Sequence, residues 1–216
     1  MVLLTRAEVG RRLAQGLGAM LTEEPVVLAL TPGGVCVASE VASELHAPLD
    51  VLAAHRLDVP GRPRSTFGAV ADGHVLLLED RIRELQLPAD YVAGLVNRVR
   101  REVEHEAATL RNGQPAVPLV HRVVVLVDDG SSEAVQVASA VTALRRAGAE
   151  QVIFAAPTAS AELWRALVGL CDQRLVLFEP AGQVKTVVCD PEFAHTTHYD
   201  VRAMVRRSRE HLAIPS

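Results

Sequence analysis

The chain has 216 residues, 49% of them hydrophobic and 22% charged, with a formal net charge of −4. This length and composition predict a single globular domain over residues 1–216 with a sizeable core. The slight acidic excess argues against a nucleic-acid-binding protein, because phosphate contacts need a basic surface. No apolar run reaches the ~18 residues of a membrane span. Three widely spaced cysteines, Cys36, Cys171 and Cys189, predict reduced thiols in a cytoplasmic protein.

Helices and strands are expected to alternate in the first half of the chain. Apolar runs predict strands at 25–30 and 49–54, and helical spacing of apolar residues predicts helices at 5–21 and 35–46. The polar, proline-punctuated residues 55–68 have the length of a functional loop. Residues 69–79 predict a hairpin that turns at Asp72–Gly73.

The second half continues the alternation. Helices are expected at 88–110, 132–147 and 161–170, and strands at 123–127, 151–156, 174–178 and 184–189. Fully apolar strands separated by helices are typical of a parallel sheet covered on both faces. The sequence therefore predicts an α/β fold with a doubly wound parallel sheet of about five strands.

Two adjacent carboxylates, Asp128 and Asp129, follow the strand predicted at 123–127, and Gly130 follows them. Ligands of such sheets bind beyond the carboxyl ends of the strands. A helix that begins there suits a phosphate, and adjacent aspartates suit ribose hydroxyls or a hydrated magnesium ion. Spacing alone supports the binding role no more than a structural one, in which both aspartates cap the helix and solvate the strand end.

A family resemblance extends through most of the chain. The phosphoribosyl diphosphate (PRPP) signature of type I phosphoribosyltransferases resembles residues 123–160, VVVLVDDGSSEAVQVASAVTALRRAGAEQVIFAAPTAS. A bacterial branch of that family is similar to residues 28–70, which match it at Gly33, Gly34, Leu49, Asp50, Val51, Leu57, Pro60, Gly61, Pro63, Gly68, Ala69 and Val70. The resemblance implies a five-stranded parallel core with a helical and hairpin hood, here at about 55–112 and 180–200. It also implies magnesium-assisted transfer of a phosphoribosyl group from PRPP to a nitrogenous base, by a homodimer.

The resemblance also implies roles for individual residues. Asp128 and Asp129 would meet the ribose hydroxyls and magnesium. Arg56 stands where the family has a lysine beside the flexible loop, and it would either supply a cation over the strand ends or belong to a solvated loop. The phosphate and ribose loop would comprise Gly130, Ser131, Ser132, Glu133, Ala134, Val135 and Gln136, and the diphosphate loop Thr31, Pro32, Gly33 and Gly34. The chain departs from the family in both loops: Pro32 replaces the arginine of the diphosphate loop, and Glu133, Ala134 and Gln136 replace a threonine, a glycine and a second threonine of the phosphate loop.

The direction of the Glu133 side chain decides whether the loop could still bind a phosphate. A carboxylate about 4 Å from a ligand phosphate would cost roughly 4 kcal/mol at an effective dielectric constant near 20. The side chain is therefore expected to turn to solvent or to serve as a built-in anion at the helix end. The prediction is a phosphoribosyltransferase with altered anion loops. The alternatives are a non-catalytic module that binds a nucleotide or nucleoside, and an accessory subunit whose helix at 88–110 builds a dimer.

Overall fold

The computed structural model describes residues 3–31, 33–62, 65–178, 188–189 and 198–212. Pro32 of the expected diphosphate loop and most of the expected hood at 180–200 lie outside these ranges. The role expected for Pro32 and the hood expected at 180–200 therefore remain predictions. Within the described parts of the chain, no helix is both long and apolar enough to cross a membrane.

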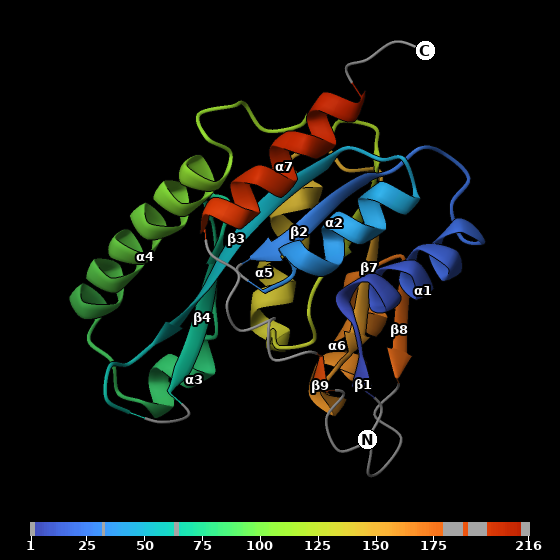
Figure 1. Cartoon of the computed structure of the whole chain (residues 1–216). Helices are drawn as coiled ribbons and strands as arrows, with labels where there is room; N and C mark the ends of the chain where they lie inside the picture. The colour runs from blue at the N-terminus through green and yellow to red at the C-terminus, as the bar shows by residue number, and fades with distance from the viewer. Residues whose placement is uncertain (1–2, 32, 63–64, 179–187, 190–197, 213–216) are drawn as a thin grey trace.

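The main sheet has seven strands in the order β5-β4-β3-β2-β6-β7-β8 (Figure 1). Their bounds are β2 Val26–Thr31, β3 Leu49–Asp58, β4 Thr66–Ala71, β5 His74–Leu77, β6 Val123–Val127, β7 Gln151–Thr158 and β8 Gln173–Phe178. The five strands from β3 to β8 run parallel, while β4 and β5 are antiparallel to their neighbours. The predicted doubly wound parallel sheet is confirmed, with a hairpin added at one edge.

The loop predicted at 55–68 is wrong in half of its length. β3 continues to Asp58, and β4 already begins at Thr66. The two strands pair antiparallel, with Arg56 opposite Ala69 and Leu57 opposite Gly68. Near the end of β3 the exposed Arg56 is followed by the buried Leu57, whereas β4 is buried from Phe67 to Ala71.

The hairpin turn predicted at Asp72–Gly73 is confirmed. β4 and β5 pair from Ala71 opposite His74 onward. Asp72 and Gly73 adopt positive φ angles of 41° and 78°. Two successive left-handed residues are what a tight two-residue hairpin turn of this kind requires.

Helices cover both faces of the sheet. α1 (Arg6–Gly18), α2 (Val35–Glu44) and α7 (His198–Leu212) lie over one face, and α5 (Ala134–Arg146) and α6 (Ala161–Leu170) over the other (Figure 1). Along β2, Val27 and Ala29 pack towards the first group, while Val26 and Leu28 pack towards the second. Since both faces are buried, the strands read as continuous apolar runs, which is why they were recognisable in the sequence.

The hairpin has a cover of its own. The helix predicted at 88–110 is confirmed as α4 (Ala89–Leu110), which packs Val99 and Val103 against Leu57 and Phe67. The short helix α3 (Glu79–Glu84) follows β5. A separate two-stranded parallel sheet joins β1 (Leu3–Leu4) to β9 (Val188–Cys189).

A buried ion pair ties the end of α4 to the start of β3. Asp50 is 1% exposed, and its carboxylate accepts hydrogen bonds from Arg111 Nε at 3.0 Å and from the Val117 N–H at 2.8 Å. Arg111 also donates to the carbonyl of Val51 at 2.8 Å. Asp50, a residue of the family-like motif, thus has a structural role at the amino end of its strand.

Replacing Arg111 with methionine should lower the free energy of unfolding by about 3–5 kcal/mol, because a buried carboxylate loses its charge partner. The matched control is Arg83→Met, which removes an exposed ion pair with Asp80 on α3 and should cost less than about 1 kcal/mol. Urea unfolding monitored by circular dichroism measures both. Equal effects of the two substitutions would contradict the structural role assigned to Arg111.

Candidate functional site

β2 and β6 lie side by side and parallel in the sheet, and successive strands are added outward in one direction from β2 and in the other direction from β6. The connection after β2 leads to α2 on one face, and the connection after β6 leads to α5 on the opposite face. A crevice at the carboxyl ends of two such strands is where open α/β sheets bind ligands. The predicted diphosphate and phosphate loops both start at this point.

The two loops touch each other through glycines. A Cβ atom on Gly33 would lie 1.8 Å from Asp129 Oδ2, so only glycine leaves this carboxylate its present position. A Cβ atom on Gly34 would lie 2.5 Å from the carbonyl oxygens of Leu30 and Val127. Both glycines therefore permit a close approach, the first to a side chain and the second to the backbone of the two central strands.

Asp128 is directed into its own loop. It is 1% exposed, and its carboxylate accepts hydrogen bonds from the Gly130 N–H at 2.8 Å and the Ser132 hydroxyl at 2.6 Å. Burial, and secondarily the charge of Asp129, raises the pKa of Asp128 to about 6. In this structure Asp128 holds the loop in shape.

Asp129 is the more accessible carboxylate of the pair. It is partly exposed, and its Oδ1 atom accepts a hydrogen bond from the Ser131 N–H at 2.9 Å. Its Oδ2 atom lies beside Gly33 across the crevice. Of the two aspartates, Asp129 is therefore the one positioned to meet a ligand.

The turn after the aspartates depends on Gly130, whose φ of +92° is unfavourable for a residue with a side chain. A Cβ atom at this position would also lie 2.6 Å from the hydroxyl oxygen of Thr158. Thr158, at the end of β7, was not among the predicted site residues. Its place at the carboxyl end of the strand next to β6 is the signal that could have identified it.

α5 begins at Ala134, two residues later than predicted, with Glu133 as the N-cap residue. The Glu133 N–H donates to Gln136 Oε1 at 3.1 Å, and Gln136 Nε2 donates to the carbonyl of Ala54 at 3.2 Å. Gln136, one of the residues predicted for the phosphate loop, thus anchors the helix start to β3.

Arg56, near the end of β3, and Glu133, at the start of α5, form an ion pair. Successive side chains of a strand point to opposite faces, so Arg56 lies on the same face of β3 as Leu52 and Ala54. Because those two residues pack on the α5 side of the sheet, the guanidinium of Arg56 lies on the side where α5 begins. The expectation that Glu133 serves as a built-in anion agrees with this pairing. The predicted cation of the site is already held by a carboxylate of the chain itself.

Two further side chains, which the sequence did not single out, complete this cluster. Asp58 Oδ2 lies 3.2 Å from Arg56 Nε, and the Thr66 hydroxyl donates to Asp58 Oδ1 at 2.6 Å. The same hydroxyl lies 3.5 Å from Glu133 Oε2. The guanidinium of Arg56 therefore contacts two carboxylates, and the crevice carries an excess of negative charge.

The predicted magnesium site can be tested against the donor set. Within the described ranges no group of three or more histidine, cysteine or acidic side chains is arranged to hold a metal ion. Magnesium, however, is commonly held by one or two carboxylates together with oxygens of a substrate. The buried Asp128, whose oxygens accept hydrogen bonds from the loop, does not fit as a ligand, whereas the partly exposed Asp129 does.

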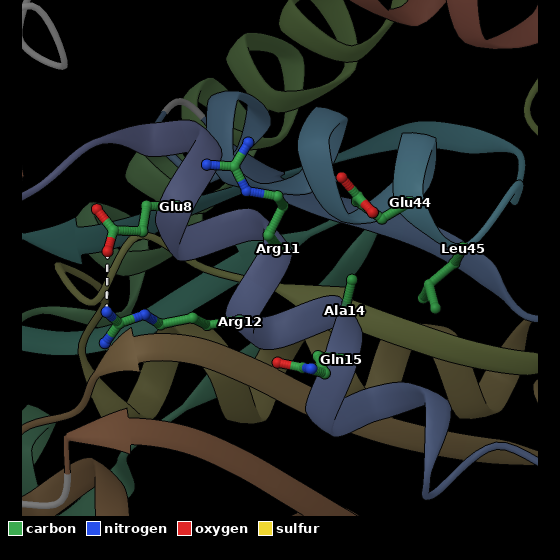
Figure 2. A pocket seen from close by; sticks show the side chains of 7 residues that line it. All are labelled: Glu8, Arg11, Arg12, Ala14, Gln15, Glu44 and Leu45. Atoms are coloured by element: carbon green, nitrogen blue, oxygen red, sulfur yellow. Dashed lines mark hydrogen bonds and ion pairs between the residues drawn. The ribbon is translucent and has the colours of Figure 1, made fainter.

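A cavity of about 520 Å³ lies elsewhere, between α1 and α2 (Figure 2). Its lining residues are Glu8, Arg11, Arg12, Ala14, Gln15, Glu44 and Leu45, and none of them was predicted as a site residue. Arg12 is paired with Glu8 at 2.8 Å. Since Glu44 and Leu45 mark the carboxyl end of α2, this cavity is remote from the crevice at which α2 begins.

Asp128 should titrate near pH 6, which carboxyl-carbon NMR can follow with Asp128→Asn for assignment. The folded protein binds this proton more tightly than the unfolded chain, whose aspartates titrate near 3.8. The contribution of Asp128 to stability should therefore be largest below about pH 4 and fall by about 3 kcal/mol as the pH rises through 6. Wild type minus Asp128→Asn isolates this change in urea unfolding. Parallel pH profiles for the two proteins would contradict the burial of this carboxyl group.

No protein-family model matches the chain. Curated relatives from Mycobacterium tuberculosis strains CDC 1551 and H37Rv, each named "Putative phosphoribosyl transferase", are 34% identical over 209 residues, or 96% of this chain. The chain spans about half the length of these relatives, 47%. The crystal structure of TT1426 from Thermus thermophilus superimposes with a TM-score of 0.77 and 29% identity, covering 96% of this chain and 99% of that one. The chain is thus a homologue, along 96% of its length, of proteins named "Putative phosphoribosyl transferase", in agreement with the family resemblance of its sequence.

Proposed function

We propose that this chain is a phosphoribosyltransferase domain, which binds PRPP in the crevice between β2 and β6 and transfers its phosphoribosyl group to a nitrogenous base. The observation that carries the proposal is the pair of loops at the carboxyl ends of these strands, in a chain homologous to curated phosphoribosyl transferases along 96% of its length. Both loops are of the kind that open α/β sheets use for phosphorylated ligands.

Asp129 is the residue proposed to hold the ribose. Its carboxylate is partly exposed and lies next to Gly33, where both loops face the crevice. A carboxylate accepts hydrogen bonds from two neighbouring hydroxyl groups, and charge-assisted bonds of this kind orient a sugar strongly. Asp128 acts as a positioning residue, because it fixes Gly130 and Ser132 through hydrogen bonds.

The diphosphate would lie over Gly33 and Gly34, at the start of α2. The N-terminus of this helix carries partial positive charge, which favours an anion. Asp129 is the residue that would hold magnesium, which would supply positive charge to neutralise the leaving diphosphate. The chain itself contributes orientation of the ribose and the field of the two helix N-termini.

A non-catalytic module that binds a nucleoside or nucleotide is the second candidate function. It is favoured by one observation, the excess of carboxylates over cations around Arg56, which weakens the hold on a phosphorylated donor. The two functions differ in product: only the transferase releases diphosphate from PRPP when a base is supplied. The same assay with a panel of purine and pyrimidine bases would identify the acceptor.

Replacing Asp129 with asparagine should weaken the binding of PRPP in the presence of magnesium by at least about tenfold, since a charged hydrogen-bond acceptor is lost. Isothermal titration calorimetry measures the affinity. The control is Glu162→Gln, which removes one negative charge from the first turn of α6 at the same edge of the sheet. Undetectable binding of PRPP to the wild-type chain at millimolar concentration, or equal affinities for both variants, would refute the proposed donor or the role of Asp129.

We also propose that the chain is a homodimer, as predicted from the family resemblance. The exposed side of α4 supports this, because a shallow groove of about 300 Å³ there is lined by Tyr91, Leu95 and Pro60. Light scattering coupled to size exclusion should give twice the chain mass of 23.2 kDa. Replacing Tyr91 with aspartate should shift the mass towards one chain, whereas a monomeric wild type would exclude the dimer.

A further inference from the structure

We propose that Glu133 is an internal competitor for the phosphate of the ligand: its carboxylate holds Arg56 in the free protein, and a phosphoryl group binds by displacing it. The identity of the ligand rests on the proposed function above. The competition itself rests on the contacts of Glu133 and Arg56, and it applies to any phosphoryl group that enters the crevice.

The position of Glu133 is that of an anion at a helix end. As the N-cap residue of α5 it precedes Ala134 and Val135, whose N–H groups have no acceptor within the helix. Its side chain reaches Arg56 on β3, which lies across the crevice. One carboxylate therefore occupies the region where a helix N-terminus and a guanidinium converge, which is the combination that attracts phosphate.

The loop before Glu133 is closed by carboxylates of the chain in the same way. The N–H groups of Gly130, Ser131 and Ser132 donate to Asp128 or Asp129. An incoming anion thus finds these backbone donors in use. Arg56 is the cation that an anion could recruit in this cluster, provided that Glu133 releases it.

Release is feasible because the pair is open to solvent. The side chains of Arg56 and Glu133 are 40% and 46% exposed, and ion pairs of such exposure are weak. A phosphate dianion carries twice the charge of a carboxylate and binds a guanidinium through two parallel hydrogen bonds. Asp58 stays at 3.2 Å from Arg56 Nε and keeps the guanidinium in place during the exchange.

This competition determines specificity as well as affinity. A dianionic phosphoryl group can displace the carboxylate of Glu133, whereas a singly charged or neutral group gains too little from Arg56 to do so. The intact crevice should therefore select phosphorylated sugars over their unphosphorylated counterparts, at the cost of a modest affinity. Without Glu133, the affinity for phosphoryl groups should rise.

The test compares Glu133→Gln with the wild type in binding inorganic phosphate, ribose 5-phosphate and PRPP with magnesium, by calorimetry at low ionic strength. Glutamine keeps the size of the side chain and removes its charge. The control Glu162→Gln removes a charge from the first turn of α6. The double variant Arg56→Met, Glu133→Gln removes the cation that phosphate is expected to gain.

Glu133→Gln should raise the affinity for inorganic phosphate and ribose 5-phosphate by about tenfold or more, and Glu162→Gln by less than about twofold. The double variant should lose the gain, and added salt should reduce it. An unchanged affinity of Glu133→Gln for inorganic phosphate, or an equal gain from Glu162→Gln, would overturn the proposal. A gain for phosphate together with no binding of PRPP by either protein would support the competition and refute only PRPP as the ligand.

Discussion

The parallel pairing of β2 with β6 is the constraint on which the rest of the structure depends. Residues such as Val27, Ala29, Val125 and Val127 are fully buried, which forces both strands into the middle of the sheet with helices on either face. Because the two connections leave to opposite faces, the loops that follow these strands part at the point where open α/β sheets bind ligands. Gly33 and Asp129 meet at this point because the buried core holds the ends of β2 and β6 side by side.

Carboxylates outnumber cations at the candidate site, and the chain offsets their charge by burial and by ion pairing. Asp128 is buried and its pKa is raised to about 6, whereas Glu133 is paired with the partly exposed Arg56. An exposed pair contributes about 0–1 kcal/mol to stability, while a carboxylate about 4 Å from an anion repels it by roughly 4 kcal/mol at an effective dielectric constant of 20. The pair of Arg56 with Glu133 therefore matters far more for what binds than for whether the chain folds.

A residue of this chain that matches the family motif does not for that reason lie where it could contact a ligand. Asp50 and Gly33 both match the family pattern, yet Asp50 ties Arg111 to the amino end of β3, whereas Gly33 lies against Asp129 at the carboxyl edge. Only residues at the carboxyl edge can touch a ligand held there. The position along a strand, and not the match itself, distinguishes the structural Asp50 from Asp129, the residue proposed to bind.

By itself, the sequence determined the parallel core and the edge at which Asp128 and Asp129 lie, because buried strands are continuous apolar runs and their carboxyl ends share one edge. It could not reveal that residues 55–58 and 66–68 are strands, since their pairing joins polar segments through a turn. Nor could it decide the direction of Glu133. Its partner Arg56 lies 77 residues away, and only the packing of β3 beside the start of α5 brings the two charges together.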